Sequence, residues 1–334
     1  MTEPAAANSA GGVYLRSYLA PLADHLARPD VTDIYVNRPG EVWLELIGGI
    51  VERHLVPELN ELVLARLARQ LAALTHQGIS REHPVMSAIL PDGARVQVIA
   101  PPATRAHLAL AIRKQVAARM SLADYVANDA FAETGRAGLT MSDDRITPTH
   151  RACDVPDLAK TLADAVRARK NILISGGTST GKTTFLNALL REIPAEERLI
   201  LIEDTPELHA DHANQVGLIA VRGELGEARV TANDLVTASL RMRPDRIILG
   251  ELRGNEAFAF LRAINSGHPG SMTTIHADTP EAAVEQLVLL VLQAGTALSR
   301  SDVRHYIAQT IDIFVQLRRG PKGRVIERVA MGYR

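Results

Sequence analysis

The sequence predicts an α+β N-terminal domain followed by an α/β domain built on a parallel sheet. Between residues 13 and 135, strands and helices follow one another without strict alternation, whereas from residue 151 onward short apolar runs alternate with helical segments. The second rhythm is typical of a parallel sheet covered on both faces. The length of 334 residues fits this division, because domains commonly contain ~100–200 residues.

In the first half, residues 1–12 are rich in Ala, Asn, Ser and Gly and are expected to be a flexible N-terminus. Leucines at helical spacing predict helices over 13–27 and 59–76. Strands separated by turn residues are predicted at Asp33–Asn37, Glu41–Leu46, Val85–Leu90, Ala94–Ala100 and Leu108–Arg113. Periodicity fades over residues 136–150, which we expect to be a linker between domains at 13–135 and 151–334.

The second half alternates between the two element types. Helices are predicted at Val155–Arg169, from Lys182 onward, and at Asn233–Arg241 and Pro280–Gln293. Strands are predicted at Asn171–Ser175, Leu199–Glu203, Arg246–Gly250 and Ser271–Ile275.

Composition excludes several classes of protein. Apolar residues make up 46% of the chain and charged residues 22%, which excludes disorder along its whole length. The balance of 37 basic and 38 acidic residues gives no support to direct nucleic-acid binding, although a local positive pore stays an alternative. The single cysteine, Cys153, excludes a disulfide framework and a multi-cysteine zinc module, and it favours a cytoplasmic location.

Targeting and membrane signals are weak. The first ten residues have neither the basic nor the apolar region of a secretory signal. The longest strongly apolar run, Leu287–Leu292, is far shorter than the ~20 residues of a membrane helix. We therefore expect a chain that does not span a membrane but could lie against a protein that does.

The strongest motif is a phosphate-binding loop. It follows an apolar strand, opens a helix and fits the pattern G-x-x-x-x-G-K-[ST]. Its members are Gly176, Gly177, Thr178, Ser179, Thr180, Gly181, Lys182, Thr183 and Thr184. Such a loop turns successive backbone N–H groups toward phosphate. The motif predicts ATP and Mg²⁺ as ligands, with Lys182 on the β- and γ-phosphates and the Thr183 hydroxyl on the metal.

Two acids end predicted parallel strands, at the edge where such sheets bind ligands. Glu203 could orient or deprotonate the attacking water, although a helix-capping carboxylate before Pro206 is an equal alternative. Glu251 follows Gly250, where many phosphate-loop ATPases have an Asp, so the magnesium-side role falls to Glu251. This leaves Glu203 as the general base, and which of the two acids serves as base stays open.

Histidines give a weaker signal. His276 ends a Gly/Ser/Thr-rich run that begins at Ser266, and a catalytic role competes with the commoner structural one. His209 and His212 have no further ligand nearby and are expected to be surface residues rather than a metal site.

Together these blocks resemble the type II/IV secretion ATPase superfamily, most of all the hexameric traffic ATPases of type IV secretion and conjugation systems. The resemblance is carried by four blocks between Gly176 and Ala277, in the family's order, and more weakly by Val36–Val42 and Leu90–Val98. The blocks read GGTSTGKTT, IEDTPEL, LRMRPDRIILGELRG and SGHPGSMTTIHA. The short chain without a four-cysteine insert looks less like the type II and pilus-extension branch.

The resemblance implies a homo-hexameric ring in which each subunit holds ATP between its N-terminal domain and a RecA-like domain. It implies an acidic box at Glu203, Asp204 and Glu207, the Walker B glutamate at Glu251 and a His box at His276. Arginines of the N-terminal domain contact the phosphates in relatives, and Arg95 and Arg113 are the candidates here, with solvated strand-edge arginines as the alternative. Gln115 departs from the proline that relatives often carry, which loosens the match near Arg113.

The implied function is an ATP-hydrolysing motor that powers pilus biogenesis or substrate translocation. It would be a cytoplasmic protein, peripheral at the inner face of the inner membrane, with inner-membrane and cytoplasmic components of the apparatus as partners. A type IV pilus motor, a nucleic-acid-translocating RecA-like ATPase and a non-hydrolysing regulatory subunit are the alternatives. Lys182, Glu203 and Glu251 disfavour the last of these.

Overall fold

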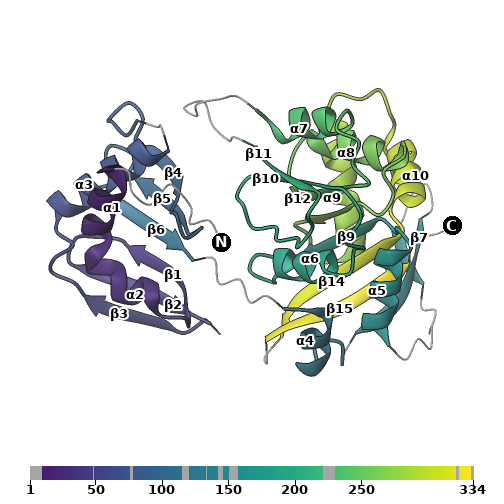
Figure 1. Cartoon of the computed structure of the whole chain (residues 1–334), viewed down its shortest axis with the longest axis horizontal. Helices are drawn as coiled ribbons and strands as arrows, with labels where there is room; N and C mark the ends of the chain where they lie inside the picture. Colours follow the sequence, from purple (N-terminus) through teal and green to yellow (C-terminus); the bar gives the residue numbers. More distant parts are fainter. Residues whose placement is uncertain are drawn as a thin grey trace. The chain divides into compact units, whose positions relative to one another are not determined.

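The computed structural model describes two compact units (Figure 1). The described residues are 10–47, 49–75, 78–114, 120–132, 134–141, 146–149, 157–220, 230–320 and 323–331. The first unit holds the described residues as far as 114, and the second unit those from 120 onward. Cys153 and Gln115 lie outside the described residues.

The first unit is a six-stranded sheet with neighbouring strands antiparallel, in the order β3-β2-β1-β6-β5-β4. The strands are β1 Val31–Val36, β2 Glu41–Leu46, β3 Val51–Leu55, β4 Val85–Ile89, β5 Arg95–Ile99 and β6 Ala109–Arg113. Buried residues alternate with half-buried or exposed ones along β5 and β6, as expected when one face of a sheet covers a core.

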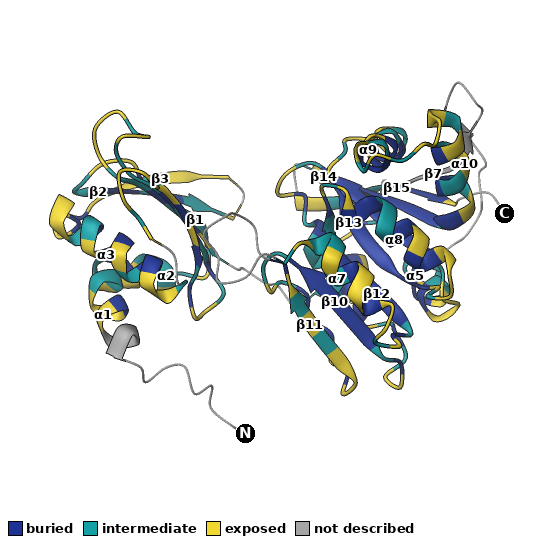
Figure 2. Ribbon diagram, turned by 90° about the horizontal axis from the view of Figure 1, so that it is seen from above, coloured by how far each residue is buried: buried dark blue, intermediate teal, exposed yellow. Residues whose placement is uncertain are grey.

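Helices cover one face of this sheet (Figure 2). They are α1 Ala10–Leu19, the short 3-10 helix η2 Ala20–Leu22, α2 Ala23–Ala27 and α3 Glu61–Leu74. The α3 helix begins where the Asn60 side chain accepts the Val63 N–H at 3.0 Å, and it buries Leu64, Leu67 and Leu71 against the strands. The predicted α+β class is confirmed for this unit.

The second unit is a nine-stranded sheet in the order β11-β10-β12-β13-β9-β14-β15-β7-β8. Its strands are β7 Gly135–Met141, β8 Ile146–Thr149, β9 Ile172–Gly176, β10 Leu199–Glu203, β11 Gln215–Ile219, β12 Arg246–Leu252, β13 Met272–Ile275, β14 Ile313–Gly320 and β15 Gly323–Met331. The six strands from β11 to β14 are parallel. The β14–β15 and β7–β8 pairs are antiparallel hairpins, so the sheet is mixed where the sequence predicted a parallel one.

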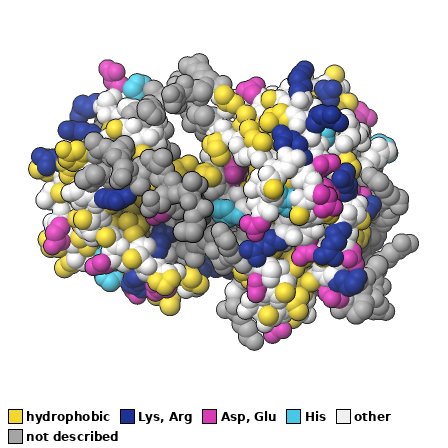
Figure 3. Space-filling model, in the orientation of Figure 1, with side chains coloured by type: hydrophobic (Ala, Val, Ile, Leu, Met, Phe, Trp, Pro, Cys, Tyr) yellow, Lys and Arg dark blue, Asp and Glu magenta, His cyan; other side chains and the backbone are white. Residues whose placement is uncertain are grey.

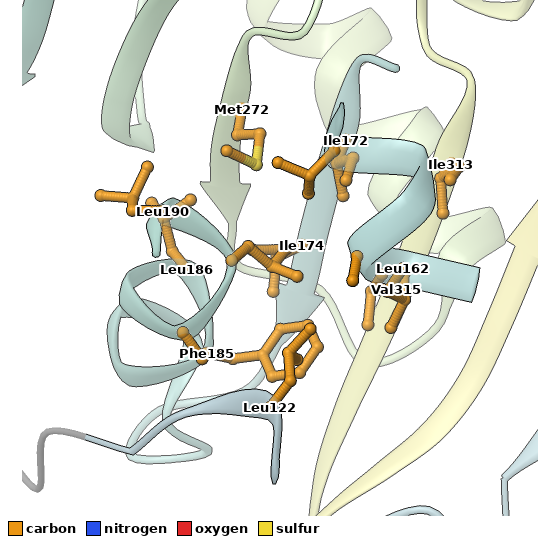
Figure 4. Close-up of a cluster of buried hydrophobic side chains, with 14 of the residues drawn as sticks. Leu122, Leu162, Ile172, Ile174, Phe185, Leu186, Leu190, Met272, Ile313 and Val315 are labelled. Carbon is orange, nitrogen blue, oxygen red and sulfur yellow. The ribbon is translucent and has the colours of Figure 1, made fainter. Parts of the chain in front are cut away.

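Helices pack on both faces of that sheet. They are α4 Leu122–Ala127, α5 Leu158–Arg167, α6 Lys182–Leu190, α7 Ala232–Ser239, α8 Glu256–Asn265, α9 Pro280–Gln293 and α10 Arg300–Thr310. Ile172 and Ile174 of β9 point to the core shared with α4, α5 and α6, whereas Leu173 between them points to the core shared with α7 to α10. Figure 4 shows Leu186 of α6 and Leu162 of α5 on the same side of the sheet as Ile174.

The division between the units falls earlier than the sequence predicted. Among the described residues it lies between residues 114 and 120, not within residues 136–150. Part of the predicted linker instead forms β7 and β8, and β7 pairs in parallel with β15 of the second unit. The α4 helix also belongs to the second unit, where Leu122 and Tyr125 join the core under α6. Non-local pairing with β15 stabilises β7, and no local pattern in the sequence encodes it.

Across the described residues, no helix combines the length and the apolar character that a membrane crossing requires.

Candidate functional site

A tight loop joins β9 to α6 at the carboxyl end of the parallel strands. Gly181 and Ser179 are both left-handed, with φ of +89° and +60°. Glycine adopts this conformation without strain, and at position 181 the loop makes use of that freedom. A Cβ placed on Gly176 would lie 2.5 Å from the Thr180 hydroxyl oxygen and 2.9 Å from the Leu317 carbonyl oxygen. A side chain at Gly176 therefore does not fit, and the loop depends on glycine for its close packing against β14.

Lys182 begins α6, and its ammonium group folds back over the loop. Its Nζ donates hydrogen bonds to the carbonyl oxygens of Gly176 and Gly177, at 2.8 and 3.0 Å. The side chain is buried, and burial lowers the pKa of the lysine because it disfavours the charged form. The ammonium group lies at the mouth of the loop and, within the described residues, has no carboxylate in direct contact. A phosphate bound there could replace its two carbonyl contacts.

His276 connects the loop to the acid of the neighbouring strand. It follows β13, and its Nδ1 lies 3.3 Å from Nζ of Lys182. Its Nε2 lies 2.9 Å from Oε1 of Glu251. Burial lowers the pKa of His276, and the nearby Lys182 and Arg253 act in the same direction. A neutral ring with its proton on Nε2 fits both neighbours, since Nδ1 then accepts from the lysine and Nε2 faces the carboxylate.

Glu251 lies near the end of β12 and forms an ion pair with Arg253. Nη1 of the same arginine lies 4.0 Å from Oδ2 of Asp204, so the acidic ends of β10 and β12 share one cation. Oε1 of Glu251 is buried, and apart from its 2.9 Å contact with Nε2 of His276, which lacks good hydrogen-bond geometry, it has no partner among the described residues. A buried carboxylate oxygen in that condition fits a site that takes up a hydrated cation.

Glu203 ends β10 beside Gly250 of β12. Oε2 of Glu203 accepts the backbone N–H groups of Glu207 and Leu208, at 2.7 and 2.8 Å. A Cβ on Gly250 would lie 3.3 Å from Cβ of Glu203. The missing side chain at Gly250 therefore leaves room for the glutamate, whose carboxylate is buried and fixed in direction by the two amides.

The structure brings the loop, both acids and His276 together at the carboxyl edge of neighbouring strands β9, β13, β12 and β10. Asp204 joins them through Arg253, whereas Glu207 contributes its backbone N–H to Glu203. His212 is buried with Nε2 3.1 Å from the Pro194 carbonyl oxygen, so the prediction of a surface residue is wrong for it. His209 is exposed, and within the described residues no group of three potential ligands could hold a metal ion.

Arg95 and Arg113 occupy paired positions on β5 and β6 of the first unit. Nε of Arg113 forms an ion pair with Oδ1 of Asp33 at 2.8 Å, and the Arg113 side chain is exposed. Arg95 lies half-buried on the neighbouring strand. The two arginines are therefore neighbours on one sheet face, as side chains on directly opposed residues are.

Sequence reasoning missed two cations of the second unit. Arg253 follows Glu251 by two residues, and this spacing on an extended strand could have indicated it. Arg324 of β15 donates from Nη1 to the Thr184 hydroxyl at 3.2 Å. No local signal points to Arg324, because 140 residues separate it from Thr184.

Comparisons with known proteins agree with this geometry. Residues 149–319 match the family model described as type II/IV secretion system protein. The type IV secretion system protein VirB11 of Bartonella henselae is 38% identical over 316 residues, which cover 90% of this chain and 88% of that protein. These relatives confirm the resemblance to type IV secretion ATPases that the motifs indicated.

Solved structures extend the comparison to the fold. The VirB11 ATPase of the Brucella suis type IV secretion system, in complex with sulphate, is 36% identical with a TM-score of 0.50, covering 95% of this chain and 97% of that one. The pilus retraction motor PilT with bound ADP is 20% identical with a TM-score of 0.58, covering 96% and 83%, and shows a shared fold. The chain belongs to the type II/IV secretion system protein family.

Proposed function

We propose that this protein is the ATP-hydrolysing motor of a type IV secretion or conjugation apparatus, and that it powers pilus biogenesis, substrate translocation or both. The observation that carries the proposal is the contact chain from Lys182 through His276 to Glu251, at 3.3 and 2.9 Å, beside a phosphate-binding loop. Such a chain couples the phosphate-binding cation to the acid that ends β12. Family membership supports the secretion role.

The loop residues 176–184 bind the phosphates through backbone N–H groups, and Lys182 leaves its two carbonyl acceptors for the β- and γ-phosphate oxygens. Thr183 and Glu251 would hold Mg²⁺, and the suited oxygen is the buried Oε1 of Glu251, which faces Nε2 of His276 at 2.9 Å without a hydrogen bond of good geometry. When bound, the metal neutralises charge on the β- and γ-phosphates.

Glu203 is the proposed general base. Its Oε2 is anchored by two backbone amides, so the carboxylate has a fixed orientation from which Oε1 can accept the proton of the attacking water. His276, neutral near pH 7, contacts both Lys182 and Glu251. A shift of Lys182 toward the terminal phosphate would therefore alter the position of the ring and its contact with Glu251. Arg95 and Arg113 are proposed to stabilise the charge of the transition state from the first unit.

The motor is proposed to act as a homo-hexamer at the inner face of the inner membrane, with membrane and cytoplasmic components of the apparatus as partners. The names of the relatives, a type IV secretion system protein and a type IV secretion system ATPase, support a place in such an apparatus, and the hexamer and its partners rest on the resemblance of the motifs. A nucleic-acid translocase is less well supported, because basic and acidic side chains are intermixed on the face of the second unit drawn in Figure 3.

Phosphate release from ATP by the purified full chain with Mg²⁺ tests the enzymatic part. Wild type is expected to hydrolyse ATP, and Lys182→Ala to lose hydrolysis because the loop loses its only lysine. Lys160→Ala is the matched control, because Lys160 is exposed on α5 and pairs with Asp164 away from the loop. Complementation of a strain that lacks the gene tests the secretion part: wild type should restore transfer and Lys182→Ala should not. Wild-type turnover by a folded Lys182→Ala protein would overturn the assignment of the site.

A further inference from the structure

We propose that Arg324 binds the α-phosphate of the nucleotide, the phosphate next to the nucleoside. The inference rests on the proposed function, since it concerns the same nucleotide site. It adds a cation from the C-terminal hairpin to a site that the motifs confine to residues 176–276.

The position of Arg324 carries the first step. Its side chain lies along the loop, because a Cβ built on Gly181 would come within 2.6 Å of Cδ and 2.9 Å of Nε of the arginine. Its Nη1 donates to the hydroxyl oxygen of Thr184 at 3.2 Å. Arg324 is exposed, and within the described part of the chain this hydroxyl is its one hydrogen-bond partner. The other N–H donors of the guanidinium are therefore available to a ligand.

The location is electrostatically unfavourable without an anion. Gly181 is the N-cap of α6, and Thr184 lies in its first turn. The N-terminus of a helix carries partial positive charge and disfavours cations. Both Lys182 and Arg324 lie there, and no carboxylate among the described residues forms an ion pair with either. A bound phosphate would compensate the charges of Lys182 and Arg324 and the partial positive charge of the helix N-terminus. This explains why an arginine lies at this place.

Sheet order identifies which phosphate Arg324 meets. The strands run β12-β13-β9-β14-β15, so Glu251 and His276 approach the loop from one side of β9 and Arg324 from the other. The lysine, the histidine and the acid mark the end of the site where the terminal phosphate reacts. A nucleotide laid across the loop then has its α-phosphate on the β14–β15 side. Thr184, one residue past the magnesium-binding Thr183, lies on that side too.

The test measures equilibrium binding to the full chain of ADP and of adenylyl imidodiphosphate, a slowly hydrolysed analogue of ATP. Arg324→Ala is expected to raise both dissociation constants by the same factor, about 10-fold or more, because a hydrogen bond from a charged group contributes ~1.5–3 kcal/mol. Arg324→Lys should recover part of the affinity, since it keeps the charge without the fork. The kcat for ATP should change less than KM, because the α-phosphate gains no charge in the transition state.

Arg318→Ala is the matched control. Arg318 lies on the partner strand of the same hairpin, is exposed and pairs with Glu327 at 3.5 Å, so its replacement should leave both dissociation constants within twofold. Arg324→Ala with wild-type affinity for both ligands would overturn the inference, as would weaker binding of the ATP analogue alone, which would place the arginine at the γ-phosphate. Failure of the wild type to bind either ligand would overturn the proposed function instead.

Discussion

Nδ1 of His276 lies 3.3 Å from Nζ of Lys182, so the ring that follows β13 contacts the cation of the phosphate loop. The same ring contacts Glu251 through Nε2. A proton on Nδ1 would remove the acceptor that faces the lysine. It would also add a positive charge between Lys182 and Arg253. The protonation state of His276 should therefore control the arrangement of Lys182 and Glu251 to which ATP binds.

The pH dependence follows from the lowered pKa of His276. Burial is the main cause, Lys182 and Arg253 add to it, and Glu251 and Asp278 oppose it. In the folded protein the ring takes up its proton only below the ordinary value of 6.5, whereas the unfolded chain does so near 6.5. Hence ATPase activity should decline on the acid side only below pH 6.5, where the ring of His276 takes up its proton. The unfolding free energy should decrease as pH falls through 6.5, because the unfolded chain then binds more protons.

Histidine NMR titration, assigned with His276→Gln, measures this pKa directly. The midpoint for His276 is expected below 6.5, and the acid limb of the pH–rate profile should follow it in the wild type. A midpoint above 6.5 would mean that attraction by Glu251 outweighs burial, which would contradict the expected direction.

Glu203→Gln should bind ATP and hydrolyse it slowly. The amide oxygen can still accept the N–H groups of Glu207 and Leu208, so the loop after β10 should keep its shape. Loss of a general base typically slows the chemical step ~10²–10⁴-fold. Single-turnover hydrolysis with a nucleotide-binding assay separates the two effects. If Glu251→Gln shows this behaviour while Glu203→Gln is nearly active, the two roles are reversed.

The double variant Arg95→Ala with Arg113→Ala should lose most ATPase activity. Arginines that stabilise transition-state charge can contribute ~10³-fold or more to the rate. The exposed ion pair of Arg113 with Asp33 adds only ~0–1 kcal/mol to stability, so folding and assembly should persist. Steady-state ATPase assays beside light scattering would measure both. Arg69→Ala, on the exposed side of α3, is the control, and an active double variant would make the two arginines ordinary surface residues.

Two fragments should differ in stability. Residues 118–334 retain α4, in which Tyr125 packs edge-on against Phe185 of α6 with ring centroids 5.1 Å apart. Residues 150–334 lack α4, β7 and β8, and exposing the partners of Leu122 and Tyr125 should cost ~3 kcal/mol or more. Unfolding followed by circular dichroism measures the difference, and equal midpoints would show that α4 is dispensable. Neither fragment carries Arg95 or Arg113, so we expect both to hydrolyse ATP slowly.

Local signals predicted the centre of the second unit well. The apolar runs of β9, β10, β12 and β13 and the glycines of the loop place most of the site, because parallel strands buried on both faces read as continuous apolar segments. The mixed edge of the sheet was missed because β7 pairs with β15 across almost 200 residues of sequence.

Short or exposed elements also escaped prediction. The α4 helix has six residues, too few to show a helical period, although Ser121 and Asp124 form a capping box at its start. The β3 strand, Val51–Leu55, is an edge strand whose residues are exposed or half-buried, and its pairing with β2 decides its conformation. The surface position predicted for His212 was wrong for a similar reason, because the carbonyl oxygen of Pro194, 18 residues earlier in the chain, supplies its hydrogen-bond acceptor.

The absence of a side chain at Gly250 has a consequence for how members of this family are recognised from sequence. The side chain of Glu203 from β10 occupies the space beside it, because a Cβ at position 250 would lie 3.3 Å from Cβ of Glu203. A search that demands an acidic residue at the position of Gly250 itself would therefore overlook this chain. A search for a carboxylate in that volume, whichever strand contributes it, would find it.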